Sequence, residues 1–195
     1  ETYTYTSSNT SVVKVDSEGN VKAKKAGTAY IKVQGNTSGK YVLLNVYIYN
    51  TGASVVGNYS YTYDGTTKTA EFIGIASGAS VSNVVIPAKV TINGIKYKVT
   101  SVAAKALYHE TAVTSITIGK NVSSIGKKAF ALCTSLKTVT VKTTKSSLYL
   151  NKKIFYKDSK LRKITLKKKN KSTLKKTFYK AVKNSKLKTS KVKIK

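Results

Sequence analysis

A 23-residue internal repeat constrains this chain more than any other feature of its sequence. When the stretch 99–121 is aligned with the stretch 122–144, their apolar residues coincide, and Leu107 falls on Phe130. A third copy follows with a shift of 25 residues, and a degraded fourth copy ends the chain. A period in the twenties is typical of a stacked solenoid, in which each unit buries its apolar face only against its neighbours.

The repeat predicts one column of inward-facing side chains through the stack, formed by Leu107, Phe130, Phe155 and Phe178. Cys133 is expected on the same inward side as a small apolar core residue. Since it is the only cysteine, an internal disulfide framework is excluded.

The strands of the repeat also predict a surface, because alternate residues of a stacked strand leave the core. In the second repeat we expect Leu136, Val139 and Val141 inside. The candidate binding residues on the open sheet face and in the adjoining basic patch are Thr138, Thr140, Lys142, Lys163, Thr165, Lys167, Lys168, Lys169, Lys171, Lys191, Lys193 and Lys195. The pattern indicates a broad, shallow surface that grades from hydroxyl to lysine side chains, rather than a pocket.

The residues before the repeats predict two further parts. Residues 1–50 alternate apolar and polar in short runs between turn residues, which indicates strands of a β-sandwich. Residues 55–98 contain two hairpin signals, Asp64-Gly65 and Asn93-Gly94. We expect this segment to cap the stack, because the first repeat would otherwise expose its core.

The N-terminal part resembles the second half of a group 2 bacterial Ig-like domain. The residues that carry the resemblance are Tyr5 to Asn9, Ser11-Val12, Val15-Asp16, Gly19, Val21, Ala23 and Ala26 to Ala29. Tyr5 stands where this family usually has Trp, and the first strands of such a domain are absent. The resemblance therefore implies a partial sandwich whose inner face and one strand edge are exposed.

Residues 55–195 resemble the BspA-like class of leucine-rich repeats. The motif residues are Ile125-Gly126, Ala129-Phe130, Cys133, Leu136, Val139 and Val141, with Val113, Ile116, Ile118 and Asn121 in the preceding copy. Thr144 replaces the Asn in the second copy. The resemblance implies that residues 126–130 open a short helix, and that equivalent residues do so in the other units.

Together these features predict a β-rich α+β fold, with a partial Ig-like β-sandwich unit followed by a short leucine-rich-repeat solenoid. The expected domains are 1–50 and 55–195, the latter with a hairpin cap at 55–98 and repeats at 99–121, 122–144, 148–170 and 171–195.

The net charge of +29 is unevenly distributed, with +3 over residues 1–50, +7 over 51–144 and +19 over 145–195. Lysine-rich surfaces attract polyanions with salt-dependent affinity, so teichoic acid, glycosaminoglycan and nucleic acid are candidate partners. We rank nucleic acid lowest, because phosphate and base-edge recognition favours Arg and the chain has only Arg162. The alternative is that the lysines only keep a short solenoid soluble.

The residues of common catalytic and metal sites are sparse in this sequence. The seven carboxylates are scattered, His109 is the only histidine, and no phosphate loop or dinucleotide fingerprint is present. We therefore expect no catalytic residue, no metal site and no cofactor, and no enzymatic activity in this chain. A membrane span is not expected either, since no run of 18 apolar residues occurs.

The BspA-like resemblance implies a function outside the cell, because such proteins are bacterial surface proteins associated with adhesion. It suggests a non-catalytic binding module, on the bacterial surface or secreted, whose partner is a host extracellular-matrix or cell-surface protein. Two alternatives remain open: attachment to an anionic wall polymer through the lysines, or service as an accessory region of a larger secreted enzyme. No N-terminal signal peptide is recognisable, so we expect either a mature fragment or a piece excised from a longer protein.

Overall fold

The structure is a computed structural model that describes residues 1–25, 27–48, 51–143, 148–166 and 171–195. The chain divides into two compact units, one comprising Glu1–Thr51 with Asp64–Thr66 and the other Gly52–Tyr63 with Thr67–Lys195. The domain limits expected from the sequence, 1–50 and 55–195, stay a prediction.

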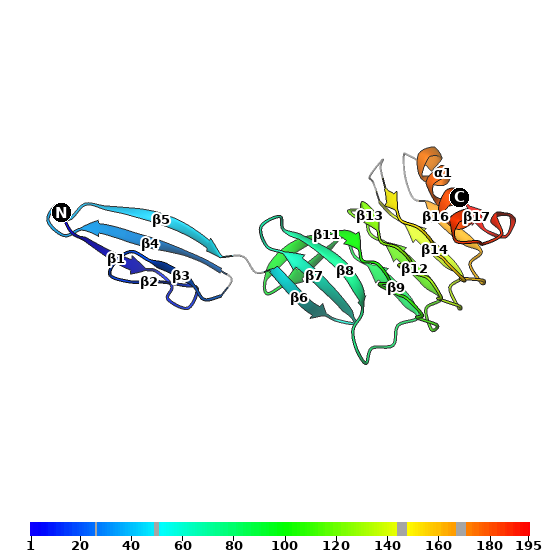
Figure 1. Ribbon diagram of the computed structural model, residues 1–195, viewed down its shortest axis with the longest axis horizontal. Coiled ribbons are helices and arrows are strands. Elements are labelled where there is room, and N and C mark those ends of the chain that lie inside the picture. Colours follow the sequence, from blue (N-terminus) through cyan, green and yellow to red (C-terminus); the bar gives the residue numbers. More distant parts are fainter. Residues whose placement is uncertain (26, 49–50, 144–147, 167–170) are drawn as a thin grey trace. The chain divides into compact units, whose positions relative to one another are not determined.

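The first unit contains an antiparallel sheet and a separate strand pair (Figure 1). The sheet has the order β1 (Tyr3–Ser7), β4 (Gly27–Gly35), β5 (Tyr41–Ile48), and the pair consists of β2 (Val13–Val15) and β3 (Val21–Ala23). Val13 and Ile31 are buried between these elements. Strand β5, in contrast, leaves Val42 and Leu44 more than half exposed. The unit is thus a partial Ig-like sandwich with an open face, as the sequence predicts.

The second unit begins with the strands that cap the repeats. They are β6 (Thr51–Val56), β7 (Tyr59–Asp64), β8 (Thr69–Ile75), β10 (Lys89–Ile92) and β11 (Ile95–Val102). Asn93 and Gly94, between β10 and β11, both have left-handed φ angles, 50° and 78°, as a tight type I′ hairpin requires. Strand β8 pairs in parallel with β11, so the cap continues the sheet of the first repeat.

Two parallel ladders join the repeats (Figure 1). The five-stranded sheet has the order β9 (Asn83–Ile86), β12 (Ser115–Ile118), β14 (Thr138–Val141), β16 (Lys163–Leu166), β17 (Lys193–Ile194). In the other ladder, β13 (Ser124–Ile125) lies between β11 and β15 (Tyr149–Leu150). Ile116 pairs with Val139, which pairs with Ile164, so the 23- and 25-residue shifts read from the sequence are confirmed.

On the turn side of the repeats, the expected short helix at 126–130 is wrong. Lys128 and Leu132 have left-handed φ angles of 56° and 64°. The equivalent residues of the neighbouring repeats, Lys105, His109, Lys153 and Lys157, have the same conformation. A right-handed helix cannot contain a left-handed residue at every fourth position, so the chain forms a turn here instead.

Backbone hydrogen bonds join the repeats on this turn side as well. The N–H of Leu107 donates to the carbonyl of Ala129 over 2.7 Å, and the N–H of Phe130 donates to the carbonyl of Ile154 over 3.0 Å. The predicted column is confirmed, since Leu107, Phe130, Phe155 and Phe178 are all fully buried in one core. The rings of Phe130 and Phe155 lie 5.9 Å apart.

In the part of the chain that the structure describes, the only α-helix is α1 (Lys171–Asn184) of the last repeat, which is followed by the 3-10 turn η1 (Thr189–Lys191). Helix α1 buries Leu174, Phe178, Ala181 and Val182, which have helical spacing. The carbonyls of α1 accept hydrogen bonds within the helix, so the third repeat bonds to a different acceptor. The N–H of Phe155 donates to the hydroxyl of Ser185 over 3.0 Å. The buried hydroxyl of Ser185 in turn donates to the carbonyl of Ala181 over 2.8 Å.

Replacing a member of the column tests whether it supports the stack. We expect Phe130→Ala to lower the free energy of unfolding by about 3–5 kcal/mol, through lost burial and the cavity left behind. Urea unfolding followed by circular dichroism measures this value. Tyr149→Ala, which truncates an exposed ring in the same unit, is the control and should change it little.

Ser185→Ala tests the connection between the third repeat and the helical cap. The substitution leaves the buried N–H of Phe155 without its acceptor, so we expect a loss of about 1–3 kcal/mol in the free energy of unfolding. Hydrogen exchange should also accelerate at the Phe155 amide. Unchanged protection of that amide would contradict this role of the hydroxyl.

Candidate functional site

The open face of the five-stranded sheet carries two straight rows of side chains. Strand register places Asn83, Ser115, Thr138, Lys163 and Lys193 in one row, and Val85, Thr117, Thr140 and Thr165 in the other. The residues between them, such as Val139 and Ile164, are fully buried. Because successive side chains of a strand point to opposite faces, burial of these apolar residues leaves the two rows pointing away from the core.

The rows form a shallow polar surface. The hydroxyl-bearing members are partly exposed, and the Ser115 hydroxyl donates to Oδ1 of Asn83 across the strands over 2.8 Å. Parallel strands lie about 4.8 Å apart, so hydroxyl groups recur at that interval along each row. Such a surface can donate and accept hydrogen bonds over a wide area, but its side chains are too short to enclose a small molecule.

The last repeat departs from the register that the sequence suggests. Aligning the degraded fourth copy by its apolar residues sets Val192 on Ile164 and hence Lys191 opposite Lys163, whereas the structure sets Lys193 there. Lys191 instead belongs to η1 and leaves the sheet. Lys195 follows β17 and accepts a hydrogen bond from the N–H of Leu166 over 2.7 Å. The shift of two residues arises because α1 and η1 replace the shorter turn of the other repeats.

The other predicted residues lie at the margin of this face or away from it. Lys142 is exposed directly after β14, and its N–H donates to the carbonyl of Ile118 over 2.9 Å. Lys171 is exposed at the first position of α1. Lys167, Lys168 and Lys169 lie outside the described residues, as does Thr144.

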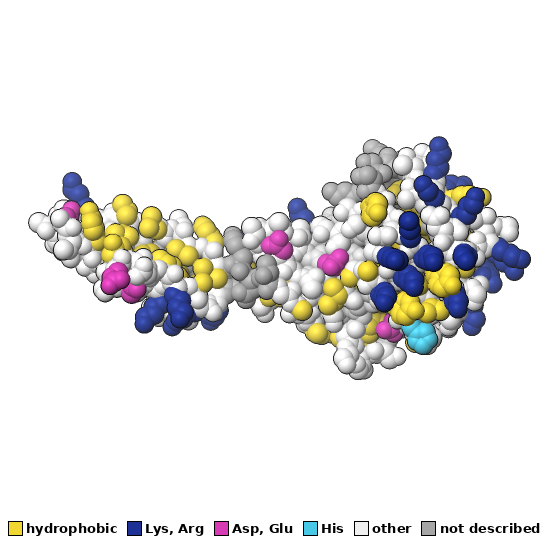
Figure 2. All heavy atoms as spheres, in the orientation of Figure 1, with side chains coloured by type: hydrophobic (Ala, Val, Ile, Leu, Met, Phe, Trp, Pro, Cys, Tyr) yellow, Lys and Arg dark blue, Asp and Glu magenta, His cyan; other side chains and the backbone are white. Residues whose placement is uncertain are grey.

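Sequence reasoning missed a second basic surface on the turn side of the repeats. It comprises Lys105, Lys127, Lys128, Lys152, Lys153 and Lys157, which we call the turn-side lysines. The ammonium groups of Lys105 and Lys128 lie 5.6 and 5.9 Å from the ring centre of Tyr108. The repeat shift itself could have revealed this surface, since it superposes Lys105, Lys128 and Lys153. On the face drawn in Figure 2, basic side chains gather over the repeats and acidic ones are sparse.

One acidic side chain is buried among the repeats. Asp158 is fully buried, and its Oδ1 accepts a hydrogen bond from the N–H of Cys133 over 3.0 Å. Within the described chain its Oδ2 has no hydrogen-bond partner. Burial raises the pKa of Asp158 to about 8, so the neutral acid predominates at neutral pH. Sequence reasoning counted this residue only among scattered carboxylates.

Cys133 lies where the sequence predicts, in the core. Its thiol donates to the carbonyl of Leu107 over 3.0 Å, and burial, with a smaller contribution from Asp158, raises the pKa of the thiol. The thiol is therefore uncharged and unsuited to nucleophilic chemistry.

Within the described ranges, no three His, Cys, Asp or Glu side chains come together as metal ligands would. His109 is exposed on the turn side. Among the described helices, none is long and apolar enough to cross a membrane.

The raised pKa of Asp158 predicts a pH-dependent stability. Between about pH 4 and pH 8 the folded chain binds a proton at Asp158 that the unfolded chain releases, so the free energy of unfolding should fall as pH rises through this window. Asp158→Asn stays neutral and keeps an acceptor for Cys133, so it should flatten this slope and stabilise the protein by a few kcal/mol near pH 8.

Urea unfolding at several pH values measures both effects. The control is Glu71→Gln, which removes a partly exposed carboxylate in the same unit. In this variant the free energy of unfolding should depend on pH as it does in the unsubstituted chain. An equal slope in the unsubstituted chain and in Asp158→Asn would show that Asp158 is charged in the fold.

Two family models match this chain. The BspA-type leucine-rich repeat region matches residues 100–195 in six copies, and the intimin immunoglobulin-like domain matches residues 1–37. Comparison with curated proteins gives no match.

Solved leucine-rich repeat proteins are similar to this chain. One from Bacteroides capillosus is 34% identical with a TM-score of 0.51, over 58% of this chain and 80% of that one. A leucine-rich cell surface protein from Faecalibacterium prausnitzii is 26% identical with a TM-score of 0.49, over 60% of this chain but only 33% of that one. The family-model match and the 34% identity lead to one assignment: this chain belongs to the BspA-type leucine-rich repeat family.

Proposed function

We propose that the chain is a non-catalytic binding module of a bacterial surface or secreted protein, and that the open face of its five-stranded sheet holds the partner. We further propose that it works as two domains, 1–50 and 55–195. Membership of a family of surface and secreted repeat proteins supports the location, and a general role in protein interaction follows from the same family.

The two rows of side chains are the observation that carries this proposal. One row is polar across all five strands, the other is polar across three strands and ends in the exposed Val85, and the repeats fix this geometry before any partner arrives. Preorganised surfaces lose little conformational entropy on binding, which favours affinity. Lys163 and Lys193 place positive charge at one end of one row, so the matching partner is a macromolecule with an acidic region there. A host extracellular-matrix or cell-surface protein meets this description.

A second function, attachment to an anionic polymer such as teichoic acid or a glycosaminoglycan, is favoured by the turn-side lysines. They are spaced by the repeat and lie away from the sheet rows. Binding of this kind weakens steeply with salt, because each neutralised anionic group releases a counterion. The two functions therefore use different surfaces and respond differently to salt.

Thr140→Trp tests the sheet face directly. Thr140 lies on the central strand, and an indole ring there would hold a flat partner away from both rows. We expect retention of the chain on host matrix proteins or whole cells to fall by about tenfold or more, measured by surface plasmon resonance. Lys176→Trp adds the same ring at an exposed site on α1 and should bind as the unsubstituted chain does.

Salt and charge separate the two functions. Replacing Lys105, Lys128 and Lys153 by Gln should abolish retention on purified teichoic acid but not on a protein partner. If Thr140→Trp binds every surface normally while this triple variant binds none, polymer attachment is the function and the sheet face is not used.

A further inference from the structure

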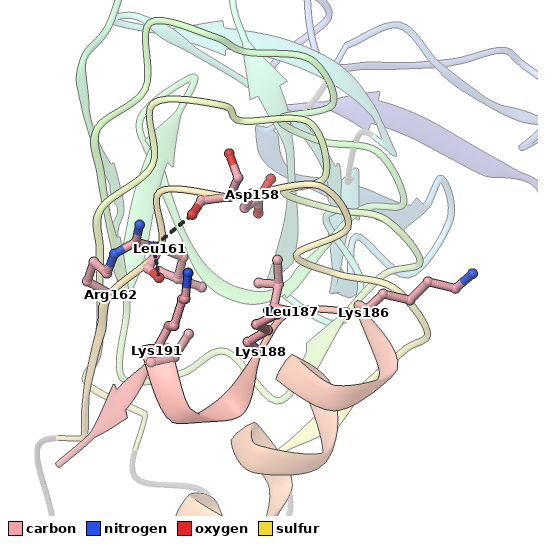
Figure 3. A pocket seen from close by; sticks show the side chains of 9 residues that line it. Asp158, Leu161, Arg162, Lys186, Leu187, Lys188 and Lys191 are labelled. Carbon is pink, nitrogen blue, oxygen red and sulfur yellow. Dashed lines mark hydrogen bonds between the residues drawn. The ribbon is translucent and has the colours of Figure 1, made fainter.

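A pocket of about 210 Å³ opens between the turn of the third repeat and the segment that follows α1 (Figure 3). Its floor is formed by Leu161, Leu187 and Val192, of which Leu161 and Val192 are buried. This volume lies below the range of drug-sized sites, so it suits a group of about one amino-acid residue. The floor is aliphatic, and no aromatic side chain lines the pocket.

Cations surround this apolar floor. Arg162 lies on one side, where its Nη1 donates to the carbonyls of Ser159 and Leu161 over 2.7 and 3.0 Å. These two bonds hold the guanidinium at the pocket in a fixed orientation. Lys186, Lys188 and Lys191 line the pocket from the segment after α1. In Figure 3 the Lys191 side chain extends toward Leu161 and Arg162, whereas the end of the Lys186 side chain points away from them.

Among the described residues, Asp158 is the only acidic one that lines the pocket. Burial raises the pKa of Asp158 to about 8. Four cations share the pocket lining with it, and Cys133, whose N–H bonds to its carboxyl, is in turn close to Glu110. Below pH 8 the pocket therefore carries positive charge without a compensating carboxylate. A bare cationic pocket with an aliphatic floor favours a ligand that is anionic at one end and aliphatic at the other.

We propose that this pocket binds the C-terminal carboxylate of a peptide or protein chain whose last residue is aliphatic. The carboxylate would contact Arg162, Lys188 and Lys191, and the last side chain would cover the floor. Sugars and nucleic-acid bases are less suitable ligands, because base recognition in particular depends on aromatic stacking that the lining lacks. The inference does not depend on the sheet face, which lies on other residues.

The test uses the whole 195-residue chain and three small probes, followed by amide chemical shifts in NMR titrations. N-acetyl-L-leucine offers the carboxylate and the aliphatic side chain, N-acetyl-L-leucinamide lacks the charge, and glucuronate carries the charge on a sugar. We expect the leucine acid to shift amides of residues 158–162 and 186–192, with an affinity about tenfold higher than that of either other probe.

Charge removal at the rim gives an independent readout. The double variant Lys188→Gln, Lys191→Gln should lower the affinity for N-acetyl-L-leucine by about fivefold per charge removed. The control variant Lys175→Gln, Lys176→Gln removes the same charge from the exposed side of α1 and should leave that affinity unchanged. Neither pair belongs to the core, so both variants are expected to fold.

Three results would overturn the proposal. The first is equal affinity for N-acetyl-L-leucine and its amide. The second is the absence of amide shifts at every concentration of N-acetyl-L-leucine up to its solubility limit. The third is an equal loss of affinity for N-acetyl-L-leucine in the two double-lysine variants. Tighter binding of glucuronate would assign the pocket to an acidic sugar instead. None of these results bears on the sheet face, so the function proposed for that face is tested separately.

Discussion

The register of backbone hydrogen bonds between successive repeats is the constraint on which the rest of the second unit depends. Ile116, Val139 and Ile164 face one another across the strands, and Leu107 bonds to the following repeat on the turn side. A slip of one residue would turn Thr140 and its equivalents into the core and expose the apolar residues. The same register therefore builds both the core and the outer rows.

Buried polar side chains lie where this backbone ladder is incomplete. The hydroxyl of Ser185 accepts a hydrogen bond from the N–H of Phe155, to which α1 presents no backbone carbonyl. The carboxyl of Asp158 accepts one from the N–H of Cys133 in the preceding repeat. Asn121 donates to the carbonyl of Ala88 over 2.8 Å, and Thr143 donates to that of Val122 over 2.7 Å. Ser185 and Asp158 thus bond across repeats, whereas Asn121 bonds to the cap and the bond of Thr143 to Val122 lies within its own repeat. A buried polar group without a partner is costly. Asp158 is the costly exception, since only one of its oxygens is bonded.

Much of this architecture could be predicted from the sequence, because apolar residues at every second position leave a strand only one way to bury them. The strand rows at Thr138 and Thr140 and the inward position of Phe130 followed from that pattern. The left-handed turn at Lys128 could not be foreseen, since lysine rarely adopts that conformation and the hydrogen bond from its N–H to the carbonyl of Lys152 joins it to a residue of the next repeat. The pocket beside Arg162 was equally hidden, because it joins residues that no repeat alignment superposes.

Helix α1 changes the turn side of the last repeat. The N–H of Phe155 bonds there to the hydroxyl of Ser185 and not to a backbone carbonyl, as the N–H of Phe130 does one repeat earlier. Between β12 and β16, however, each repeat ends in the same hydrogen-bonding pattern with which the next begins. Duplicating one such unit would widen the five-stranded sheet by about 4.8 Å and leave both ends unaltered. Gene duplication between β12 and β16 can thus adjust the reach of this module in fixed increments.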